Sequence, residues 1–281
     1  MVIDLHLHST ASDGTDTPAE VVAAAAAAGV TTMALTDHDT TAGWDEAARA
    51  AARCGIALVP GAEISCQSYG IGVHMLAYLQ DPSHPGILSE LAETRSDRLH
   101  RARRMVARIG RDYDLTWADV LEQVDGAATV GRPHIADAMV AKGLLASRDE
   151  AFATVLNARS PYYLTHYAPD AVTMVRLIRA AGGVPVMAHP RAGRRGRIVS
   201  PDVIAELAAA GMTGLEVDHR DHDAADRRLL LGLARELGLL VTGSSDYHGL
   251  GKVNAIGEHT TAPGVLEAIE AQATGVGVVR P

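Results

Sequence analysis

Two histidines near the start of the chain are spaced for metal chelation. His6 and His8 lie two positions apart in residues 2–8, where polar and apolar residues alternate as in a β-strand. Imidazoles at this spacing on a strand are preorganised to bind one divalent ion; two exposed histidines on a sheet edge are the alternative. Asp4 would share their face of the strand. The apolar residues of the segment would form the opposite, core-facing side, namely Ile3, Leu5 and Leu7.

Other candidate ligands follow predicted strands further along the chain. Asp246 and His248 repeat the two-residue spacing with two types of ligand, and a solvated loop pair is the alternative. His38 follows Asp37 at another strand end, where it could instead cap the next turn. Three isolated residues complete the set: Asp13 in a Ser-Asp-Gly turn, Glu63 after a Gly-Ala turn, and His74 between Val73 and Met75. Alone, these three indicate a turn former, a solvated carboxylate and a core histidine; their joint arrangement indicates a metal site.

The elements that would position these residues alternate between strands and helices. Strands are predicted at residues 2–8, 30–35, 56–60, 73–79, 184–188, 214–217 and 239–242. Helices are predicted at residues 18–29, 42–54, 170–181, 200–210, 224–237 and 264–273. Reactive groups of β/α barrels lie at the C-terminal ends of the strands, as the polar residues do here. The pattern therefore predicts a small β/α barrel with one mouth, because a doubly wound sheet would not bring so many strand ends to one point.

The stretch between the fourth and fifth strands has a different pattern. Residues 85–157 carry helical periodicity without a convincing strand, beginning with a long amphipathic helix through residues 89–109. Further helices are expected to start near Thr116, Gly131 and Ser147. The sequence thus predicts a barrel domain from residues 1–84 and 158–281, interrupted by a helical insertion at residues 85–157 that could cover the mouth.

Composition limits the classes of function. The net charge of −9 argues against a general nucleic-acid-coating protein, which would usually be basic, so any such substrate must be gripped locally. Cys54 and Cys66 form no CxxC motif, which argues against zinc held by thiolates and fits a reducing cytoplasm. The start of the chain lacks the apolar run of a signal peptide, and the alanine-rich residues 21–28 are too few to span a bilayer. We therefore expect a cytoplasmic enzyme without membrane attachment or an obligate protein partner.

Taken together in chain order, these motifs resemble one family. The segments DLHLHS, SDG, LTDHDT, PGAEIS, GRPH, AHP and SDYHG resemble the PHP (polymerase and histidinol phosphatase) family of metallohydrolases over nearly the whole chain. Within it, LTDHDTTAG, GAEIS, VGRPHIA and the helical insertion look most like the branch that removes the 3′-phosphate from nucleoside 3′,5′-bisphosphates. Members of that branch are also described as 5′→3′ exoribonucleases on short RNA. The implied fold is a distorted seven-stranded β/α barrel.

The resemblance implies three divalent ions and assigns their ligands. His6, His8, Glu63 and Asp246 would surround the first ion; Glu63 would bridge to a second, completed by His74 and His134; and Asp13, His38 and His248 would hold the third. This mixture of imidazole nitrogen and carboxylate oxygen suits Mn²⁺, Zn²⁺ or Fe²⁺, with Mn²⁺ our choice, and is too rich in nitrogen for Ca²⁺ or Mg²⁺. Asp4 and Asp37 then become carboxylates that orient imidazoles, although Asp4 could instead bond to backbone.

Such a centre would suit the hydrolysis of a phosphate ester. Three ions and three carboxylates leave a charge of about +3, which favours an anionic ligand in an acidic protein. A water shared between two ions would lose its proton near neutral pH and act as the nucleophile.

Several residues remain for the substrate. Arg132 could grip a phosphate, and His189 could protonate the leaving oxygen or bind the phosphate. His219 could bind substrate or be a solvated residue on the rim. Residues 191–197 are the densest basic run and could catch a second phosphate or an RNA backbone, with a solvated loop as the alternative. Arg191 itself occupies a place where the family commonly has glycine.

Four functions are compared on this basis. The preferred one is a metal-dependent phosphatase for nucleoside 3′,5′-bisphosphates that extends to short 5′-phosphorylated RNA. A phosphatase for another small monoester, such as histidinol phosphate, is the second. A non-catalytic metal-binding module is the third, and the complete set of ligands argues against it. A deaminase-type hydrolase is the fourth possibility. Barrels of that kind usually use a carbamylated lysine or a different setting of the HxH pair, and neither Lys142 nor Lys252 lies at a predicted strand end.

Overall fold

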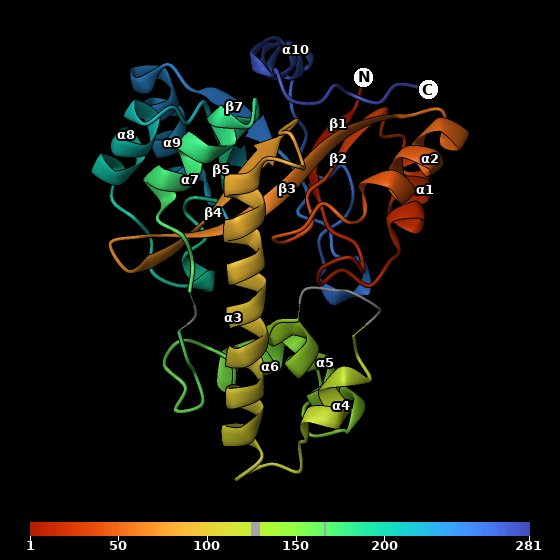
Figure 1. The fold of residues 1–281 in the computed structure, drawn as a ribbon, viewed down its shortest axis with the longest axis vertical. Helices are drawn as coiled ribbons and strands as arrows, with labels where there is room; N and C mark the ends of the chain where they lie inside the picture. The colour runs from red at the N-terminus through yellow and green to blue at the C-terminus, as the bar shows by residue number, and fades with distance from the viewer. Residues whose placement is uncertain (125–129, 166) are drawn as a thin grey trace.

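Seven strands form one sheet that curls into a nearly closed barrel (Figure 1). The computed structural model describes residues 1–124, 130–165 and 167–281. The strands neighbour one another in chain order: β1 (Ile3–Leu7), β2 (Thr32–Leu35), β3 (Ala57–Ser68), β4 (Ile71–Tyr78), β5 (Val184–Ala188), β6 (Gly214–Asp218) and β7 (Leu240–Gly243). Leu7 pairs with Tyr247 just beyond β7, and the His8 amide donates to the Tyr247 carbonyl at 2.9 Å. The predicted seven-stranded β/α barrel is confirmed.

The third strand is longer than predicted and reverses the direction of the next one. β3 runs parallel to β2 from Ala57 to Pro60 and then antiparallel to β4 from Gly61 to Ser68. The predicted strand end at residue 60 is therefore wrong. Gly61 serves close packing rather than a turn, because a Cβ there would lie 3.0 Å from the Thr36 Cγ2. As a result, Glu63 lies within a paired strand and not after a strand end.

The first strand does not divide its side chains between faces as its alternation suggests. Ile3 and Leu5 pack inside the barrel with Tyr78, whereas Leu7 packs on the outside with Val21 of the first helix. The pairing of β1 with β2 shifts register between Asp4 and Leu7. Such an irregularity breaks the two-residue alternation locally. The expectation that all three apolar residues share one face is therefore wrong.

Helices cover the outside of the barrel and one of its ends. They are α1 (Pro18–Ala27), α2 (Trp44–Cys54), α7 (Ala171–Ala180), α8 (Pro201–Ala209), α9 (Ala224–Leu237) and α10 (Pro263–Gln272). The predictions placed each of them to within two residues at either end. Thr17 begins α1 with a capping box to Glu20, as expected for Thr-Pro at a helix start. α10 packs Leu266 and Ile269 into the barrel interior at the end away from the insertion (Figure 1).

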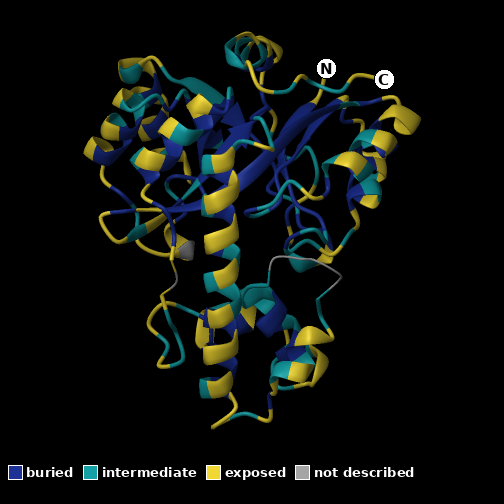
Figure 2. Ribbon diagram, in the orientation of Figure 1, coloured by how far each residue is buried: buried dark blue, intermediate teal, exposed yellow. Residues whose placement is uncertain are grey.

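The insertion forms a second body below the barrel in Figure 1. Its helices are α3 (Pro85–Ile109), α4 (Trp117–Leu121), α5 (Arg132–Ala141) and α6 (Arg148–Thr154). α3 joins the two bodies, because Ile87 and Leu91 pack in the barrel's outer core while Met105 and Ile109 pack in a separate cluster of the insertion. That second cluster is visible as the dark blue faces of α3 and α5 in Figure 2. It extends as far as Leu164, and the division of the chain at residues 85 and 157 stays a prediction.

Among the described residues, no helix combines the length and the low polarity that crossing a bilayer would require. α3 has the necessary length, but arginines and carboxylates run along it.

One buried hydrogen bond ties opposite parts of the barrel together and gives a test of the fold. The Tyr78 hydroxyl donates to the Leu5 carbonyl at 2.8 Å, and Tyr78 is fully buried. Tyr78→Phe should lower the free energy of unfolding by about 1–1.5 kcal/mol, since the carbonyl loses its partner without a change in packing. Urea denaturation measures this loss. Tyr69→Phe is the matched control, because that hydroxyl contacts Glu206 on the surface, and its effect should stay below about 0.5 kcal/mol. Equal effects of the two variants would contradict the assignment.

Candidate metal centre

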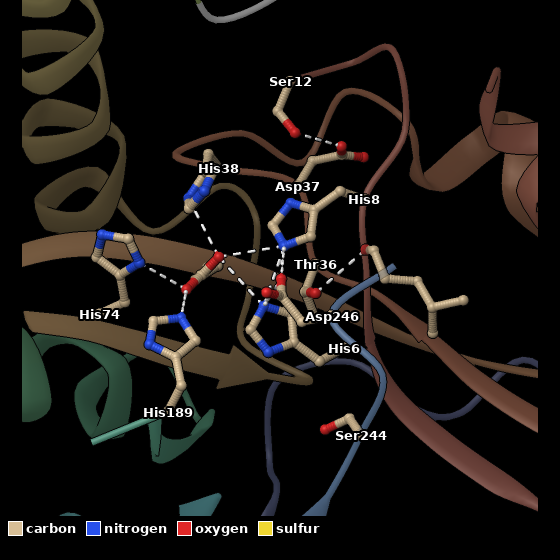
Figure 3. A network of polar contacts seen from close by, with 12 residues as sticks. His6, His8, Ser12, Thr36, Asp37, His38, His74, His189, Ser244 and Asp246 are labelled. Carbon is tan, nitrogen blue, oxygen red and sulfur yellow. Dashed lines mark hydrogen bonds and ion pairs between the residues drawn. The ribbon is translucent and has the colours of Figure 1, made fainter. Parts of the chain in front are cut away.

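The candidate ligands gather at the mouth of the barrel that faces the insertion. Figure 3 shows side chains from β1, from β4 and from the segments that follow β1, β2, β5 and β7 turned toward one centre: His6, His8, His38, His74, His189 and Asp246. Glu63 of β3 lies at that centre, and each of its two carboxylate oxygens meets a different set of imidazoles. Five of these seven side chains are buried, and those of His38 and His74 are partly exposed. The sequence therefore assembles one polar cluster inside an otherwise apolar barrel.

The first set of ligand atoms forms a compact group of four. The Nε2 atoms of His6 and His8 lie 3.0 Å apart. Glu63 Oε2 lies 3.2 Å from each of them, and Asp246 Oδ1 lies 3.4 Å from each. Four nitrogen and oxygen ligands at ~2.1 Å from one divalent ion would lie ~3.4 Å from one another in a tetrahedral arrangement. The observed spacing therefore fits a single ion among these four residues.

The second set gathers at the other oxygen of the same carboxylate. Glu63 Oε1 lies 2.6 Å from His74 Nδ1 and 2.9 Å from His189 Nε2. His189 was expected to act on substrate, and its nitrogen instead faces the same oxygen as the expected ligand His74. The rings of His74 and His189 lie 5.3 Å apart, nearly perpendicular to each other. The geometry thus offers two imidazoles and one carboxylate oxygen around this corner of the cluster.

The third set surrounds Asp13. Asp13 Oδ1 lies 3.3 Å from His248 Nε2 and 3.7 Å from His8 Nδ1, and Asp13 Oδ2 lies 3.9 Å from His38 Nε2. The other nitrogen of His38, Nδ1, lies 3.2 Å from Glu63 Oε2. His8 and His38 consequently stand between neighbouring ligand sets. The structure brings Asp13, His38 and His248 together, as the resemblance implies.

His134 is placed differently from the other expected ligands. It lies in the first turn of α5, where its Nδ1 accepts a hydrogen bond from the Gly131 amide at 3.2 Å. Among the described residues, the groups whose ligand atoms converge do not include it; they also leave out His189 and place His74 with His38 and Glu63. Burial, partly offset by the charge of Asp13, lowers the pKa of His134. Arg148 joins Asp137 of α5 to the Asp13 carbonyl, so α5 lies beside the loop of Asp13, and the hydrogen bond given for His134 is to Gly131 and not to Glu63.

Unsatisfied polar atoms show that this cluster suits cations. Among the described residues, four buried ligand atoms make no hydrogen bond: His8 Nδ1, His38 Nδ1, Glu63 Oε2 and His248 Nε2. A buried polar atom without a hydrogen bond costs ~1–3 kcal/mol, and such atoms are rare in folded proteins. Coordination to divalent ions would satisfy all four at once, and nitrogen and carboxylate oxygen are suitable donors for Mn²⁺, Zn²⁺ or Fe²⁺. The residues present therefore fit divalent metal ions.

Proton binding in the cluster follows from its charges. Burial alone would raise the pKa of Glu63, but His38, His74 and His6 hold it well below its usual range. Burial alone would lower the pKa of His8, yet Asp246 and Glu63 raise it to about 9. Because an imidazole must be neutral to bind a metal, ions and protons compete for His8. The charged carboxylate of Glu63 is ready to bind cations at neutral pH.

A carboxylate that the sequence analysis missed supports His6 from behind. Glu216 of β6 is fully buried, and its Oε1 lies 3.0 Å from His6 Nδ1. The Ser244 hydroxyl donates to Oε1 at 2.6 Å, and the His189 amide donates to Oε2 at 2.8 Å. Burial alone would raise the pKa of Glu216, but His6 holds it far below its usual range. The available signal was a glutamate between Leu215 and Val217 in a strand, where a charge is rare without a partner.

The two aspartates expected to orient imidazoles bond elsewhere. Asp4 accepts hydrogen bonds from the backbone amides of Ser245 at 3.0 Å and Gly257 at 2.9 Å, which is the alternative that the sequence left open. Burial raises the pKa of Asp4 to about 6. Asp37 accepts from the Ser9 amide at 2.8 Å and the Ser12 hydroxyl at 2.6 Å. The side chain of Asp37 therefore holds the loop that carries Asp13. The Ser9 and Ser12 donors of that loop in turn fix the orientation of the Asp37 carboxylate.

The candidate substrate residues lie in different surroundings. Arg132 donates from Nη1 to the Leu156 carbonyl at 3.0 Å, within the insertion. Arg191 points from the loop after β5 to α9, where its Nε lies 3.0 Å from Asp226 Oδ1. His219 is fully buried with its Nε2 at 3.4 Å from Asp246 Oδ2, so its interpretation as a solvated rim residue is wrong. In the basic run 191–197, Arg197 donates to the Gly70 carbonyl, and the side chain of Arg195 lies outside the described part of the chain.

Known proteins with similar sequences and structures agree with this geometry. The family model described as the PHP domain matches residues 4–165. A 3′,5′-nucleoside bisphosphate phosphatase from Chromobacterium violaceum is 35% identical over 257 residues, covering 89% of this chain and 88% of that protein. A 5′-3′ exoribonuclease from Haemophilus influenzae is 35% identical over 251 residues, covering 87% and 89%.

A solved structure shows the same similarity. A protein from Bifidobacterium adolescentis, described as a candidate metal-dependent phosphoesterase, superposes with a TM-score of 0.95 and 42% identity over 97% of this chain and 96% of its own. Since the family model spans more than half of the chain and the metal-ligand types converge at the barrel mouth, the chain belongs to the PHP domain family and is a metal-dependent hydrolase.

Proposed function

We propose that the protein removes the 3′-phosphate from nucleoside 3′,5′-bisphosphates. One observation carries the proposal: the buried carboxylate of Glu63 gathers imidazoles from several strands and loops, beside the carboxylates of Asp13 and Asp246. Such a cluster is suited to holding several cations next to a phosphate ester. The similarity to the Chromobacterium violaceum phosphatase over 89% of this chain supports the choice of substrate.

The proposed centre holds three divalent ions, and Mn²⁺ is our choice over Zn²⁺ and Fe²⁺. His6, His8, Glu63 and Asp246 would hold the first ion; Glu63, His74 and His189 the second; and Asp13, His38 and His248 the third. We place His189 in the position first given to His134, because its Nε2 lies 2.9 Å from Glu63 Oε1. Bound ions would supply the Lewis acidity that activates a water nucleophile and offsets the charge on the phosphate.

Neighbouring side chains hold the first ligands in place. Asp246 Oδ2 lies 2.9 Å from the Lys252 ammonium and 3.4 Å from His219 Nε2, while Oδ1 faces His6 and His8. Fixing one oxygen orients the other toward the ligand set. Glu216 fixes the ring of His6 in the same way, as carboxylates commonly do for metal-binding histidines. We propose that Lys252, His219 and Glu216 are positioning residues, and that His219 acts without touching substrate.

His134 is proposed to face the substrate. Its Nδ1 accepts the Gly131 amide hydrogen bond, so the neutral ring carries its proton on Nε2. Burial lowers the pKa of His134 and keeps the ring neutral near pH 7, which leaves one N–H donor. This donor could bond to a phosphate oxygen, and Arg132 lies two residues before it at the start of α5. Arg191 is not proposed as a substrate residue because it is paired with Asp226.

A second candidate activity is the stepwise hydrolysis of short 5′-phosphorylated RNA. It is favoured by the 35% identity to the Haemophilus influenzae exoribonuclease over 87% of this chain. Both candidate substrates carry a 5′-phosphate next to a 3′-phosphate ester, so one site could serve both. We further propose that the enzyme acts in the cytoplasm, where such nucleotides occur; its two cysteines are unpaired, as is usual there.

The substrate is tested with a panel of phosphate esters. Purified protein with Mn²⁺ should release phosphate from adenosine 3′,5′-bisphosphate and leave the 5′-monophosphate, because the cationic centre binds and polarises the 3′-phosphate. The rates on histidinol phosphate and on a short 5′-phosphorylated RNA are measured beside it, by phosphate release and by product chromatography. EDTA should abolish turnover. A higher rate on histidinol phosphate would replace the proposed substrate, and no turnover of any of the three would support the non-catalytic alternative.

The ligand assignment is tested by counting metal ions. His189→Ala should bind one Mn²⁺ fewer than the wild type after dialysis, since Glu63 Oε1 would keep only His74 as a neighbouring imidazole. His134→Ala is the matched variant and should keep the full metal content while losing activity. Inductively coupled plasma mass spectrometry gives the number of ions per chain. The reverse result, with metal lost from His134→Ala alone, would restore the original assignment.

The role of Glu216 gives a further prediction. Glu216→Gln should weaken Mn²⁺ binding by ~10–100-fold, because His6 loses the charged acceptor at its Nδ1, and excess Mn²⁺ should restore much of the activity. Titration of activity against Mn²⁺ concentration measures the shift. Glu267→Gln, an exposed change of the same type on α10, should leave the titration unchanged. An unaltered Mn²⁺ requirement in Glu216→Gln would rule out this positioning role.

A further inference from the structure

One arginine of the insertion, Arg148, reaches the loops of the barrel mouth. Arg148 is the first residue of α6, and the Ser147 side chain caps this helix by accepting from the Glu150 amide at 3.1 Å. α6 and α5 share the apolar cluster of the insertion, and they lie beside each other in Figure 1. The cap and this packing therefore fix the start of α6 next to Asp137 of α5.

The guanidinium of Arg148 divides its donors between the insertion and the barrel. Its Nε and Nη2 donate to the two carboxylate oxygens of Asp137, and such a paired contact fixes the plane of the guanidinium. The remaining nitrogen, Nη1, donates to the Asp13 carbonyl at 3.4 Å. Burial alone would lower the pKa of Arg148, but Asp137 and Asp13 raise it. Asp137 thus directs one edge of the guanidinium toward the loop that carries a candidate ligand.

A glycine of the barrel makes room for this guanidinium. Gly251 ends the short 3-10 turn Gly249–Gly251, which directly follows the candidate ligand His248. A Cβ added at Gly251 would lie 2.8 Å from Cζ of Arg148. The backbone of Gly251 is not in the left-handed region, so its conformation does not require glycine. The close approach of Arg148 is therefore what requires the missing side chain.

The two loops that Arg148 contacts also bond to each other. The Thr15 amide donates to the His248 carbonyl at 3.2 Å, and the Leu250 amide donates to the Thr15 hydroxyl at 2.8 Å. Thr15 lies two residues after Asp13. At the inner side of the same loops, Asp13 Oδ1 lies 3.3 Å from His248 Nε2. Arg148 consequently contacts both loops whose ligands form the third set.

We propose that Arg148 is a positioning residue for the third ligand set, because it ties the insertion to the loops that hold Asp13 and His248 at the spacing of metal ligands. The inference rests on the proposed three-ion centre and adds to it a residue that acts through backbone contacts. The ion pair with Asp137 suits this role, since an arginine without its carboxylate would repel the bound cations.

Loss of the Arg148 contact should weaken the binding of one ion. Mn²⁺ is titrated by calorimetry into the metal-free protein, and in Arg148→Met the weakest of the three sites should lose ~10–100-fold in affinity, while the other two keep theirs. Mass spectrometry of the dialysed protein should then find one Mn²⁺ fewer per chain, and excess Mn²⁺ should restore activity. Arg159→Met changes an exposed arginine of the insertion and should bind Mn²⁺ as the wild type does.

A second variant displaces the guanidinium without removing it. Gly251→Ala should push Arg148 away from the turn, because the added Cβ meets the flexible end of that side chain, while the ion pair with Asp137 can persist. The affinity of the same Mn²⁺ site should fall, by a smaller factor than in Arg148→Met. Gly232→Ala is the matched control, since a Cβ there would have no atom within 4 Å, and it should leave Mn²⁺ binding unchanged.

Hydrogen exchange tests the positioning role without any metal. In the metal-free protein, the amides of Thr15 and Leu250 should exchange ~10-fold faster in Arg148→Met than in the wild type, as expected when a contact that holds the loops is lost. Amides of β6 should exchange at the wild-type rate. If thermal melting shows that Arg148→Met is unfolded, Gly251→Ala takes its place in both experiments.

Three results would overturn the proposal. The first is wild-type affinity at every Mn²⁺ site in both Arg148→Met and Gly251→Ala. The second is an equal loss at every site, which would give Arg148 a general role in stability. The third is unchanged exchange of the Thr15 and Leu250 amides. If the wild type itself binds fewer than three ions, the proposed centre fails, and the exchange experiment still decides whether Arg148 holds the two loops.

Discussion

A single buried carboxylate organises the mouth of this barrel. Glu63 is 1% exposed, and its oxygens lie within 3.2 Å of nitrogens from His6, His8, His38, His74 and His189. Moving a carboxylate out of water costs several kcal/mol unless charges and hydrogen bonds compensate for it. Every strand or loop that delivers a histidine to Glu63 therefore contributes to keeping this charge inside. Bound divalent ions would offset the rest of the cost of burying the Glu63 carboxylate. The same cations that would activate a substrate would therefore also stabilise the buried charge in the fold.

The position of Glu63 depends on a local change in the sheet. A parallel strand that ended at Pro60 would place the next residues in a loop, whereas the antiparallel pairing with β4 keeps Glu63 opposite Leu76. The hairpin turn itself uses left-handed conformations at Tyr69, with φ 50°, and at Gly70, with φ 69°, as tight two-residue turns require. This hairpin brings His74 onto the same inner face as Glu63. The mixed sheet is thus a condition for the second set of ligands.

Prediction from sequence succeeded where local patterns determine structure. Helix starts such as Thr17 before Pro18, and the two-residue spacing of His6 with His8, carry their signals within a few residues. Prediction was wrong where pairing between distant segments determines the structure. The extension of β3 past Pro60 depends on its pairing with β4, and the different face of Leu7 depends on the register shift between β1 and β2. Such contacts are settled by tertiary structure, which local propensity does not encode.

The same distinction explains the outcome at the site. His6, His8 and Asp246 are recognisable because ligand types repeat at strand spacing. Glu216 was missed because a lone glutamate in a strand has no local partner to identify it, and its partners Ser244 and His6 lie far away in the chain. The place of His134 depends on how the insertion lies against the barrel, through contacts such as that of Arg148 with the Asp13 carbonyl, which the sequence of the insertion does not determine.

The insertion contacts the barrel through the loop that carries the candidate ligand His38. Arg95 donates to the backbone carbonyl of Asp39 at 2.5 Å, and the side chain of Asp39 accepts from the Ser65 amide at 2.8 Å. Asp39 itself has φ 55°, a left-handed conformation that costs a residue other than glycine ~1–3 kcal/mol and persists only where surrounding contacts maintain it. α3 supplies some of those contacts, so a shift of the insertion would release strain directly beside His38. The position of the insertion and the placement of His38 are therefore linked through the contacts of Arg95 and Arg98 with Asp39.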